Sequence, residues 1–472
     1  MDGMLKIGTE LISEGKNKYT VKKLLGAGGQ GEVYEVSCDS IDKKEKRSFE
    51  SGRYALKWYY KHTATNRQKK ILDKLIERGR PHDSFLWPQD LIRRKKGESF
   101  GYIMPLRPKH YKSIVDLMKR KAEPSFYYLV RAAYKLTEGY RALHKAGYQY
   151  RDISFGNVFF DPKTGDVMIC DNDNVVPNGT MDGGVYGTPR FMAPEIVRGE
   201  KKSSRNTDLY SLAVLLFYMF MLNHPLEGKL EAKIRCMDIH AMNRLYGTDP
   251  VFIWDPEDMR NRPLPGYQDN AIIYWDLYPK AIKDLFIRSF TVGLSEPGKR
   301  VTENMWLSAF ANLLSGIMIC TDCGAEVFYD PWKDSEDGER ITAPDDEKSG
   351  GVSKENEGKS VNKAASPHIC WNCQKEIKVP SRLVIGKNNI ILTSKTRLYA
   401  HHIFGNYDMD TVVGEVSVNP NNPAKWGIRN KTGDIWKYIK ADGSETPVES
   451  GRSAAIARDV SIDFGETVGR FV

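Results

Sequence analysis

Alternation of apolar and polar residues predicts a β-sheet in the N-terminal part of the chain. The alternation runs through residues 19–25 and 54–59, and residues 85–88 are expected to begin a further strand. Residues 66–77 instead repeat apolar positions at helical spacing and predict one amphipathic helix.

The next part of the chain changes to the helical period. Residues 126–146 predict a long amphipathic helix, and 209–222 predict a buried helix that is too short to cross a bilayer comfortably. Residues 158–169 read as a β-hairpin between these helices. Short alternating runs between turn residues make 381–472 an all-β domain, sandwich-like in pattern. The predicted fold class is therefore α+β.

Length and charge add modest constraints. A chain of 472 residues predicts two or three domains, and 40% hydrophobic residues suffice for a sizeable core. The net charge of +9 is mild and spread along the chain, so nucleic acid is not an expected partner. The N-terminus has no apolar core of signal-peptide length, and we expect a cytoplasmic protein with no membrane association.

The cysteine spacing predicts a metal site. Two C-x-x-C pairs occur, namely Cys320 with Cys323 and Cys370 with Cys373. Four thiolates can close a tetrahedral Zn²⁺ site, and we expect a zinc ribbon over 316–380. Unpaired thiols or a redox pair are the alternative, but the βαβ setting of a redox pair is not seen. Polar residues 333–367 are expected to form a disordered insertion, in which Ser and Thr are candidates for autophosphorylation.

A glycine-rich stretch follows the first predicted strand. It consists of Gly26, Ala27, Gly28, Gly29, Gln30 and Gly31. Glycines let the backbone approach the phosphates of a nucleotide, although a plain hairpin turn is the alternative reading. The extended pattern after the glycines argues against a dinucleotide-binding fold, which needs a helix there.

Three polar residues further along form a phosphoryl-transfer set. Asp152 is followed by Asn157 and, beyond the hairpin, by Asp171. Such chemistry needs one oxygen to orient the attacking hydroxyl and oxygen ligands to hold Mg²⁺ or Mn²⁺. Asp152 would face the hydroxyl, while Asn157 and Asp171 would hold the metal, with Asp173 as the alternative ligand.

These motifs resemble those of protein kinases. Residues 150–157 resemble the catalytic loop His-Arg-Asp-x-x-x-x-Asn, with Tyr150 in place of His, and residues 187–195 resemble the end of the activation segment of Ser/Thr kinases. The chain looks like a eukaryotic-type (Hanks-type) Ser/Thr protein kinase of a bacterial branch. The resemblance implies a bilobal kinase domain over 1–315, with an N-lobe to about 105 and a C-lobe from about 106.

The resemblance also implies roles for individual residues. Lys57 would grip the ATP phosphates and pair with a helix acid, either Asp73 or Glu77. The adenine pocket would be lined by Val33, Ala55, Met104 and Leu106. Thr188 would contact Asp152, Arg300 would pair with Glu195, and Asp208 would support the catalytic loop.

Two departures from the family pattern stand out. Ser154 occupies the position where Ser/Thr kinases carry a Lys, and Asn172-Asp173 replace Phe-Gly after Asp171. The predicted function is ATP-dependent phosphoryl transfer to Ser or Thr of protein substrates, the chain itself included. The alternative is a pseudokinase-type nucleotide-binding scaffold that holds partners through its zinc ribbon and β-domain.

The β-domain gives the weakest functional signal. The rhythm of its ending resembles forkhead-associated domains, which implies a phosphopeptide or protein partner, but the phosphothreonine-binding residues cannot be matched. His401 and His402 are expected at the surface rather than at a metal.

Overall fold

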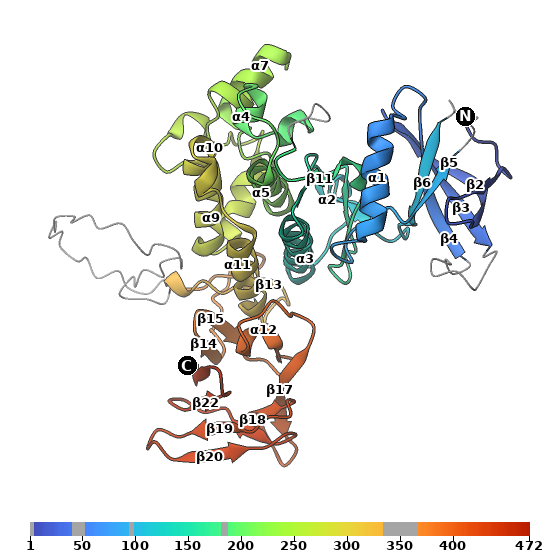
Figure 1. Ribbon diagram of the computed structural model, residues 1–472. Helices are drawn as coiled ribbons and strands as arrows, with labels where there is room; N and C mark the ends of the chain where they lie inside the picture. Colours follow the sequence, from blue (N-terminus) through green and yellow to red (C-terminus); the bar gives the residue numbers. More distant parts are fainter. Residues whose placement is uncertain (1–3, 40–51, 94–98, 181–186, 334–366) are drawn as a thin grey trace. The chain divides into compact units, whose positions relative to one another are not determined.

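The computed structural model describes residues 4–39, 52–93, 99–180, 187–333 and 367–472. The chain divides into two compact units, which are coloured by sequence in Figure 1. The first comprises Met1–Tyr274 and Leu285–Trp306, and the second comprises Trp275–Asp284 and Leu307–Val472. The predicted disordered insertion, 333–367, lies outside the described residues except at its two ends.

The first unit begins with an antiparallel sheet in the order β1-β2-β3-β4-β6-β5. Its strands are β1 (Glu10–Ile12), β2 (Lys18–Ala27), β3 (Gly31–Asp39), β4 (Gly52–Tyr59), β5 (Asp90–Arg93) and β6 (Phe100–Pro105). Successive residues of β4 serve opposite faces, since Leu56 packs in one apolar cluster and Ala55 in another with Leu72 of the adjoining helix. The strands predicted at 19–25 and 54–59 are confirmed.

The strand expected to begin at residues 85–88 starts later, at Asp90. The backbone bonds of the earlier residues go elsewhere, because Phe85 forms an isolated bridge with Ile169 and the N–H of Leu86 donates to the carbonyl of Ile169 at 2.9 Å. Pro88 has no N–H to donate and cannot join a ladder.

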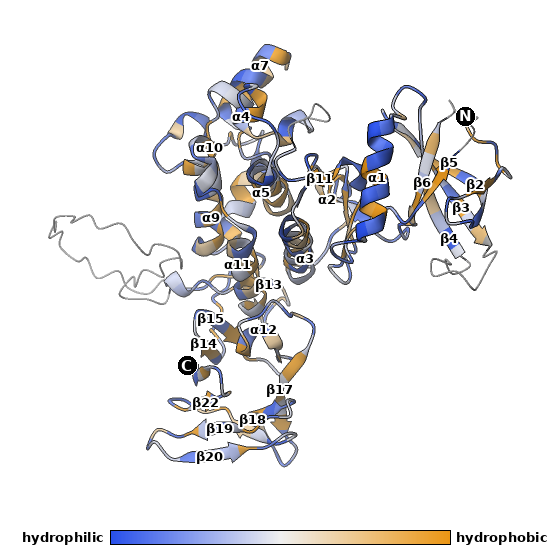
Figure 2. Cartoon of the chain, viewed as in Figure 1, coloured by the Kyte–Doolittle hydropathy of each residue, from blue (hydrophilic) through white to orange (hydrophobic). Residues whose placement is uncertain are grey.

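Helix α1 (Asn66–Arg78) confirms the helix predicted at 66–77. The Thr65 side chain caps it by accepting from the N–H of Gln68, and Gly79, with φ of 76°, ends it. Leu72 and Leu75 are its buried residues, and most of its remaining surface is hydrophilic (Figure 2). Amphipathic burial therefore holds α1 in place.

The chain continues mainly as helices. They are α2 (Ile114–Met118), α3 (Phe126–Lys145), α4 (Pro194–Val197), α5 (Arg205–Met221), α6 (Lys229–Ala232), α7 (Ile239–Asn243), α8 (Asp269–Leu277), α9 (Lys280–Phe290), α10 (Val292–Ser295) and α11 (Glu303–Ser315). All residues of α5 from Thr207 to Met221 are buried, which confirms the buried helix predicted there. Over the described ranges, none of the helices has the length and apolar character needed to cross a membrane.

Short strands fix the loops between these helices. They are β7 (Lys112–Ser113), β8 (Tyr148–Gln149), β9 (Val158–Phe160), β10 (Val167–Ile169) and β11 (Val176–Pro177). β9 and β10 form the predicted hairpin, and β8 pairs with β11. The segments on either side of 150–157 are therefore tied into the sheet structure.

The second unit contains the remaining strands. They are β12 (Ile317–Ile319), β13 (Glu326–Phe328), β14 (Arg382–Ile385), β15 (Asn388–Ile391), β16 (Arg397–Tyr399), β17 (Val412–Asn419), β18 (Asn422–Asn430), β19 (Trp436–Ile439), β20 (Glu445–Val448), β21 (Ser453–Ala455), β22 (Ser461–Asp463) and β23 (Val468–Phe471). From β14 on they form a six-stranded sheet, β15-β14-β23-β22-β19-β20, and a four-stranded sheet, β16-β17-β18-β21. Both sheets contribute to one apolar core around Trp436.

One expectation for this unit is wrong. His401 and His402, on the short helix α12 (Ala400–Ile403), are buried rather than exposed. His402 is held by two contacts, from its Nε2 to the hydroxyl of Ser315 at 2.9 Å and from the backbone N–H of Tyr399 to its Nδ1 at 2.9 Å. These two hydrogen bonds satisfy both ring nitrogens of His402 and allow its burial. The sequence of a polar dipeptide does not reveal such partners.

Candidate active site

Asp208 of α5 anchors the loop at 150–157 through hydrogen bonds to its backbone. The carboxylate of Asp208 accepts hydrogen bonds from the backbone N–H groups of Tyr150 at 2.6 Å and Arg151 at 3.0 Å. Arg151 has a positive φ of 73°, a conformation that needs such support. Two backbone donors on one buried carboxylate fix the loop on the most buried helix of the unit.

The side chain of Asp152 contacts two other side chains, those of Thr188 and Asn157. Its carboxylate accepts from the hydroxyl of Thr188 at 2.8 Å and from the amide of Asn157 at 3.2 Å. The Asn157 amide also donates to the backbone carbonyl of Asp152 at 2.9 Å. The structure therefore brings together three predicted site residues.

Lys57 of β4 reaches the segment after β10. Its Nζ lies 3.4 Å from a carboxylate oxygen of Asp171 and 2.9 Å from one of Asp173. Gln30 of the glycine-rich stretch accepts from the same amine at 3.2 Å. Residues remote in sequence therefore meet at one buried amine.

One amine, that of Lys57, faces two carboxylates, those of Asp171 and Asp173. Burial by itself would lower the pKa of Lys57, but Asp173 and Asp171 raise it above its usual value, so the amine stays charged. Burial raises the pKa of Asp171, Lys57 opposes that rise and Asp173 adds to it. Asp171 adopts the left-handed conformation, with φ of 50°, and its side chain remains 42% exposed. It is the carboxylate of the pair that solvent or a ligand can reach.

Neither predicted helix acid of α1 faces Lys57 in the described part of the chain. Asp73 lies 3.8 Å from Arg93, and Glu77 is exposed. The side chain of α1 that points to the site is Gln68, whose amide donates to the backbone carbonyl of Asp173 at 2.8 Å. Helical phase explains the difference, because Leu72 and Leu75 take the buried face and turn both acids away.

The glycine-rich stretch joins β2 to β3 and leaves room above it. A Cβ atom at Gly26, Gly28 or Gly29 would meet nothing within 4 Å, so the backbone is open to an approaching ligand. Gly31 differs, because its Cβ would lie 2.2 Å from the carbonyl oxygen of Trp58. Three of the glycines thus leave space, and the fourth permits close strand pairing.

The predicted adenine-lining residues belong to one apolar cluster. Ala55 and Met104 are buried in it and face each other across β4 and β6, while Val33 and Leu106 pack against it half-buried. The structure brings all four together.

A second buried ion pair braces the activation-segment motif. Arg300 makes a bidentate contact with Glu195, at 2.8 Å and 2.7 Å, and both side chains are almost fully buried. Arg300 also donates to the backbone carbonyls of Gly293 and Asn206. The guanidinium therefore uses four of its five N–H donors, as a buried cation requires.

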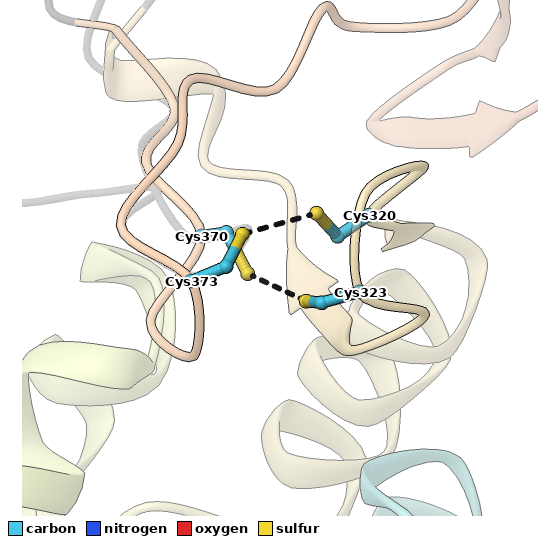
Figure 3. Close-up of side chains that lie close together, drawn as sticks. All are labelled: Cys320, Cys323, Cys370 and Cys373. Carbon is cyan, nitrogen blue, oxygen red and sulfur yellow. Dashed lines mark hydrogen bonds between the residues drawn. The ribbon is translucent and has the colours of Figure 1, made fainter.

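The four cysteines of the two C-x-x-C pairs converge in the second unit. Their sulfur atoms all lie within 4.8 Å of one another, with Cys320 and Cys373, and likewise Cys323 and Cys370, 3.6 Å apart. Figure 3 shows the side chains pointing toward one another from two turns. None of the four is in a disulfide.

The two cysteine turns are built alike. The N–H of Cys320 donates to the carbonyl of Ala325 and that of Cys370 to the carbonyl of Lys375, both at 2.9 Å. A backbone hydrogen bond from Ala325 lowers the pKa of the Cys323 thiol to about 6, which favours a thiolate. The cluster has the donor set and geometry of a metal site.

Comparison with known proteins places the first unit in a family. Residues 19–285, more than half of the chain, match the model of the protein kinase domain. The chain belongs to the protein kinase family. The kinase match covers the sheet, the catalytic loop and the activation-segment motif, and it supports a bilobal kinase fold.

Relatives of this kinase are similar over the same part. The chain is 26% identical to a probable Ser/Thr protein kinase, CCRP1, from Zea mays over 226 residues, which is 47% of this chain and 34% of the relative. It is 27% identical to the Ser/Thr kinase plk-2 of Caenorhabditis elegans over 230 residues, 46% of this chain and 33% of the relative. It is 26% identical to the Ser/Thr kinase PknD of Chlamydia abortus over 259 residues, 49% of this chain and 27% of the relative. The chain thus spans less than half the length of each.

Sequence reasoning missed part of the kinase site. Tyr59 donates its hydroxyl to Asp173, and Gln68 holds the same residue through its backbone. The usable signal was the apolar spacing of α1, which leaves Gln68 rather than Asp73 or Glu77 on the side of the site. Tyr59 carries no such signal, because an aromatic residue in a strand reads as core.

Proposed function

We propose that this chain is an ATP-dependent protein kinase that transfers the γ-phosphoryl group to Ser or Thr of protein substrates, itself included. The observation that carries the proposal is the convergence of Lys57 on Asp171 at 3.4 Å. The contact between Asp152 and Thr188 at 2.8 Å supports it at the acceptor side. The names of its relatives as Ser/Thr kinases agree with this choice of acceptor.

The residues divide the work as follows. When bound, ATP would supply the γ-phosphoryl group, and Mg²⁺ would neutralise part of the negative charge of the phosphates. Asp152 orients the acceptor hydroxyl and accepts its proton, held in position by Asn157 and Thr188. Asn157 and Asp171 would hold the metal through oxygen ligands, and the charged amine of Lys57 would contact the phosphates. The open backbone at Gly26, Gly28 and Gly29 leaves room for those phosphates.

The presence of Ser154 in place of a lysine lowers the rate of transfer that we expect. Ser154 is buried where kinases of this class carry a Lys, so the transferring phosphoryl group lacks one cation. Losing one electrostatic contact of this kind costs roughly 3–4 kcal/mol of barrier, or about 100- to 1,000-fold in rate. We therefore propose a slow enzyme, or one that a partner activates by bringing a cation.

A transfer assay tests the proposal. Labelled ATP with Mg²⁺ should label the chain or an added Ser/Thr peptide, and Asp152→Asn should lower the rate by about 100-fold or more. Asp166→Asn is the matched control, because Asp166 is an exposed acid of the hairpin turn. Equal rates for wild type and Asp152→Asn would remove Asp152 from the mechanism.

The pseudokinase scaffold is the second candidate. Ser154 and the replacement of Phe-Gly by Asn172-Asp173 are the observations that favour it. Titration of a fluorescent ATP analogue separates the two functions, since binding without any transfer would select the scaffold. Transfer that depends on Asp152 would exclude it.

We also propose that the cysteine cluster holds one structural Zn²⁺ ion, in a ribbon over 316–380. Four sulfurs around Zn²⁺ at about 2.3 Å would stand about 3.8 Å apart, close to the 3.6 Å separations here. Free thiols suit a reducing, cytoplasmic setting. Metal analysis should find about one zinc per chain, lost in Cys323→Ser and kept in Cys236→Ser, a change at an exposed cysteine outside the cluster. One zinc retained by Cys323→Ser would exclude Cys323 as a ligand.

Domain limits at 315 and 380, and a forkhead-associated likeness for 381–472, stay predictions. A phosphothreonine peptide library incubated with the full chain tests the partner of the β-domain. Binding that is equal for phosphorylated and unphosphorylated peptides would leave only a general protein partner.

A further inference from the structure

Asp173 is a buried carboxylate whose acceptor sites face protein donors. Its side chain is 0% exposed. Its two oxygens lie 2.9 Å and 3.0 Å from the Nζ of Lys57, and one of them also accepts from the hydroxyl of Tyr59. A carboxylate that is enclosed and paired in this way is placed to hold a cation of the protein rather than a soluble metal ion.

The neighbouring Asp171 has the opposite character. It is 42% exposed and lies farther from Lys57, at 3.4 Å. One of the two acids is therefore turned outward to the site, and the other is turned inward to the lysine. This division favours Asp171 over Asp173 as the metal ligand.

The helix that carries a lysine partner in the kinase family does not do so here. Asp73 is beside Arg93, Glu77 is exposed, and the α1 side chain that donates to Asp173 is the neutral amide of Gln68. That amide contacts the backbone of Asp173 rather than Lys57. In the part of the chain that the structure describes, the negative charge beside Lys57 comes entirely from Asp171 and Asp173.

We propose that Asp173 is the positioning residue for Lys57 and replaces the missing helix acid, with Tyr59 and Gln68 as its supports. This role in catalysis rests on the proposed kinase function, although the ion pair itself does not. The lysine partner and the exposed metal-binding acid then lie on one short stretch, 171–173. A movement of that stretch would withdraw both at once.

The first test is a double-mutant cycle in melting temperature on the full chain without nucleotide, with Lys57→Met and Asp173→Asn. Each single change strands a buried polar group and should lower the Tm by roughly 5 °C or more. The double variant should fall by clearly less than the sum, because neither unpaired partner remains. If the Tm losses of the two single variants add up in the double variant, Lys57 and Asp173 are not paired and the proposal is overturned. The same cycle between Lys57 and Glu77 should be additive, and coupling there would restore the helix acid and overturn the proposal.

The second test measures kcat/KM for transfer in the same variants. Asp173→Asn should lower kcat/KM by about 100-fold in the wild-type background, because a misplaced Lys57 no longer meets the phosphates. It should have no further effect when Lys57→Met is already present. A loss that multiplies in the double variant would make Asp173 a metal ligand or an independent catalytic group.

A milder variant covers the case in which Asp173→Asn does not fold. Tyr59→Phe removes one hydroxyl donor to Asp173 without changing its volume, and it should lower kcat/KM by about 3- to 10-fold, again only when Lys57 is present. The same loss without Lys57 would overturn the proposal. The melting cycle needs no enzymatic activity. An inactive wild type would therefore refute the kinase function, while the melting cycle would still test the pairing of Lys57 with Asp173.

Discussion

His144 of α3 lies between two buried carboxylates, and this placement predicts how stability depends on pH. Its Nε2 is 3.1 Å from Asp208, its Nδ1 contacts Glu303, and its side chain is 1% exposed. Both ring nitrogens face acceptors, which the doubly protonated imidazolium satisfies and the neutral ring cannot. Despite burial, the two carboxylates raise the pKa of His144 from 6.5 to about 9.

The magnitude and sign follow from that difference. A raised pKa in the folded state adds stability that is fully present below pH 6.5 and is lost as the pH rises through 9. At about 1.4 kcal/mol per pH unit, the contribution is about 3 kcal/mol at pH 6 and falls below about 1 kcal/mol at pH 9. The partner Glu303, whose pKa is lowered to about 2, limits the window only in acid.

The assay compares wild type with His144→Gln, whose side chain does not titrate. Urea unfolding followed by near-UV circular dichroism at pH 6, 7, 8 and 9 gives the difference in free energy of unfolding between the two proteins. That difference should shrink by roughly 2–3 kcal/mol from pH 6 to pH 9. His240→Gln, a change at an exposed histidine of α7, is the matched control for the substitution itself. A constant difference for His144→Gln would refute an imidazolium at this position.

Three further predictions concern stability. Glu195→Gln should cost about 3–5 kcal/mol in urea unfolding because it strands the buried Arg300, whereas Glu296→Gln in the exposed pair with Lys299 should cost under about 1 kcal/mol; equal losses would contradict this. Gly31→Ala should lower the Tm by several degrees, since its Cβ would lie 2.2 Å from a backbone oxygen, while Gly28→Ala has open space and should change it little; the reverse order in a melting scan would refute the account. Trp436→Ala should cost about 3–5 kcal/mol in the second unit, against under about 1 kcal/mol for its neighbour Ile435→Ala, which is 63% exposed, and similar values for both would place the core elsewhere.

Elements with strong periodicity were predictable from sequence. The alternation in β4 and the helical apolar spacing in α1 predict these two elements, and the continuous apolar run in α5 predicts a helix that is buried all round. The pairing of Arg300 with Glu195 was also accessible, through the kinase resemblance, because a buried carboxylate requires a cation.

What sequence could not supply depends on side-chain direction and local hydrogen bonding. Asp73 and Glu77 had suitable chemistry, yet the rotation of α1 about its axis turns them away from Lys57. Asp173 was expected at most as an alternative metal ligand, and only the three-dimensional path after β10 brings its side chain to the lysine. His401 and His402 gave no sign of burial, because the groups that contact their ring nitrogens are backbone atoms and a serine distant in sequence.

The closeness of the two cysteine turns has a use in protein engineering. If a metal clamps the turns, the chain between Cys323 and Cys370 is a closed loop whose ends are fixed whatever lies between them. Doubling the length of such a loop costs only about 0.6 kcal/mol in closure entropy. A fluorescent reporter or an affinity tag inserted there should leave the catalytic unit intact, which makes this loop a convenient attachment point for following the protein in cells.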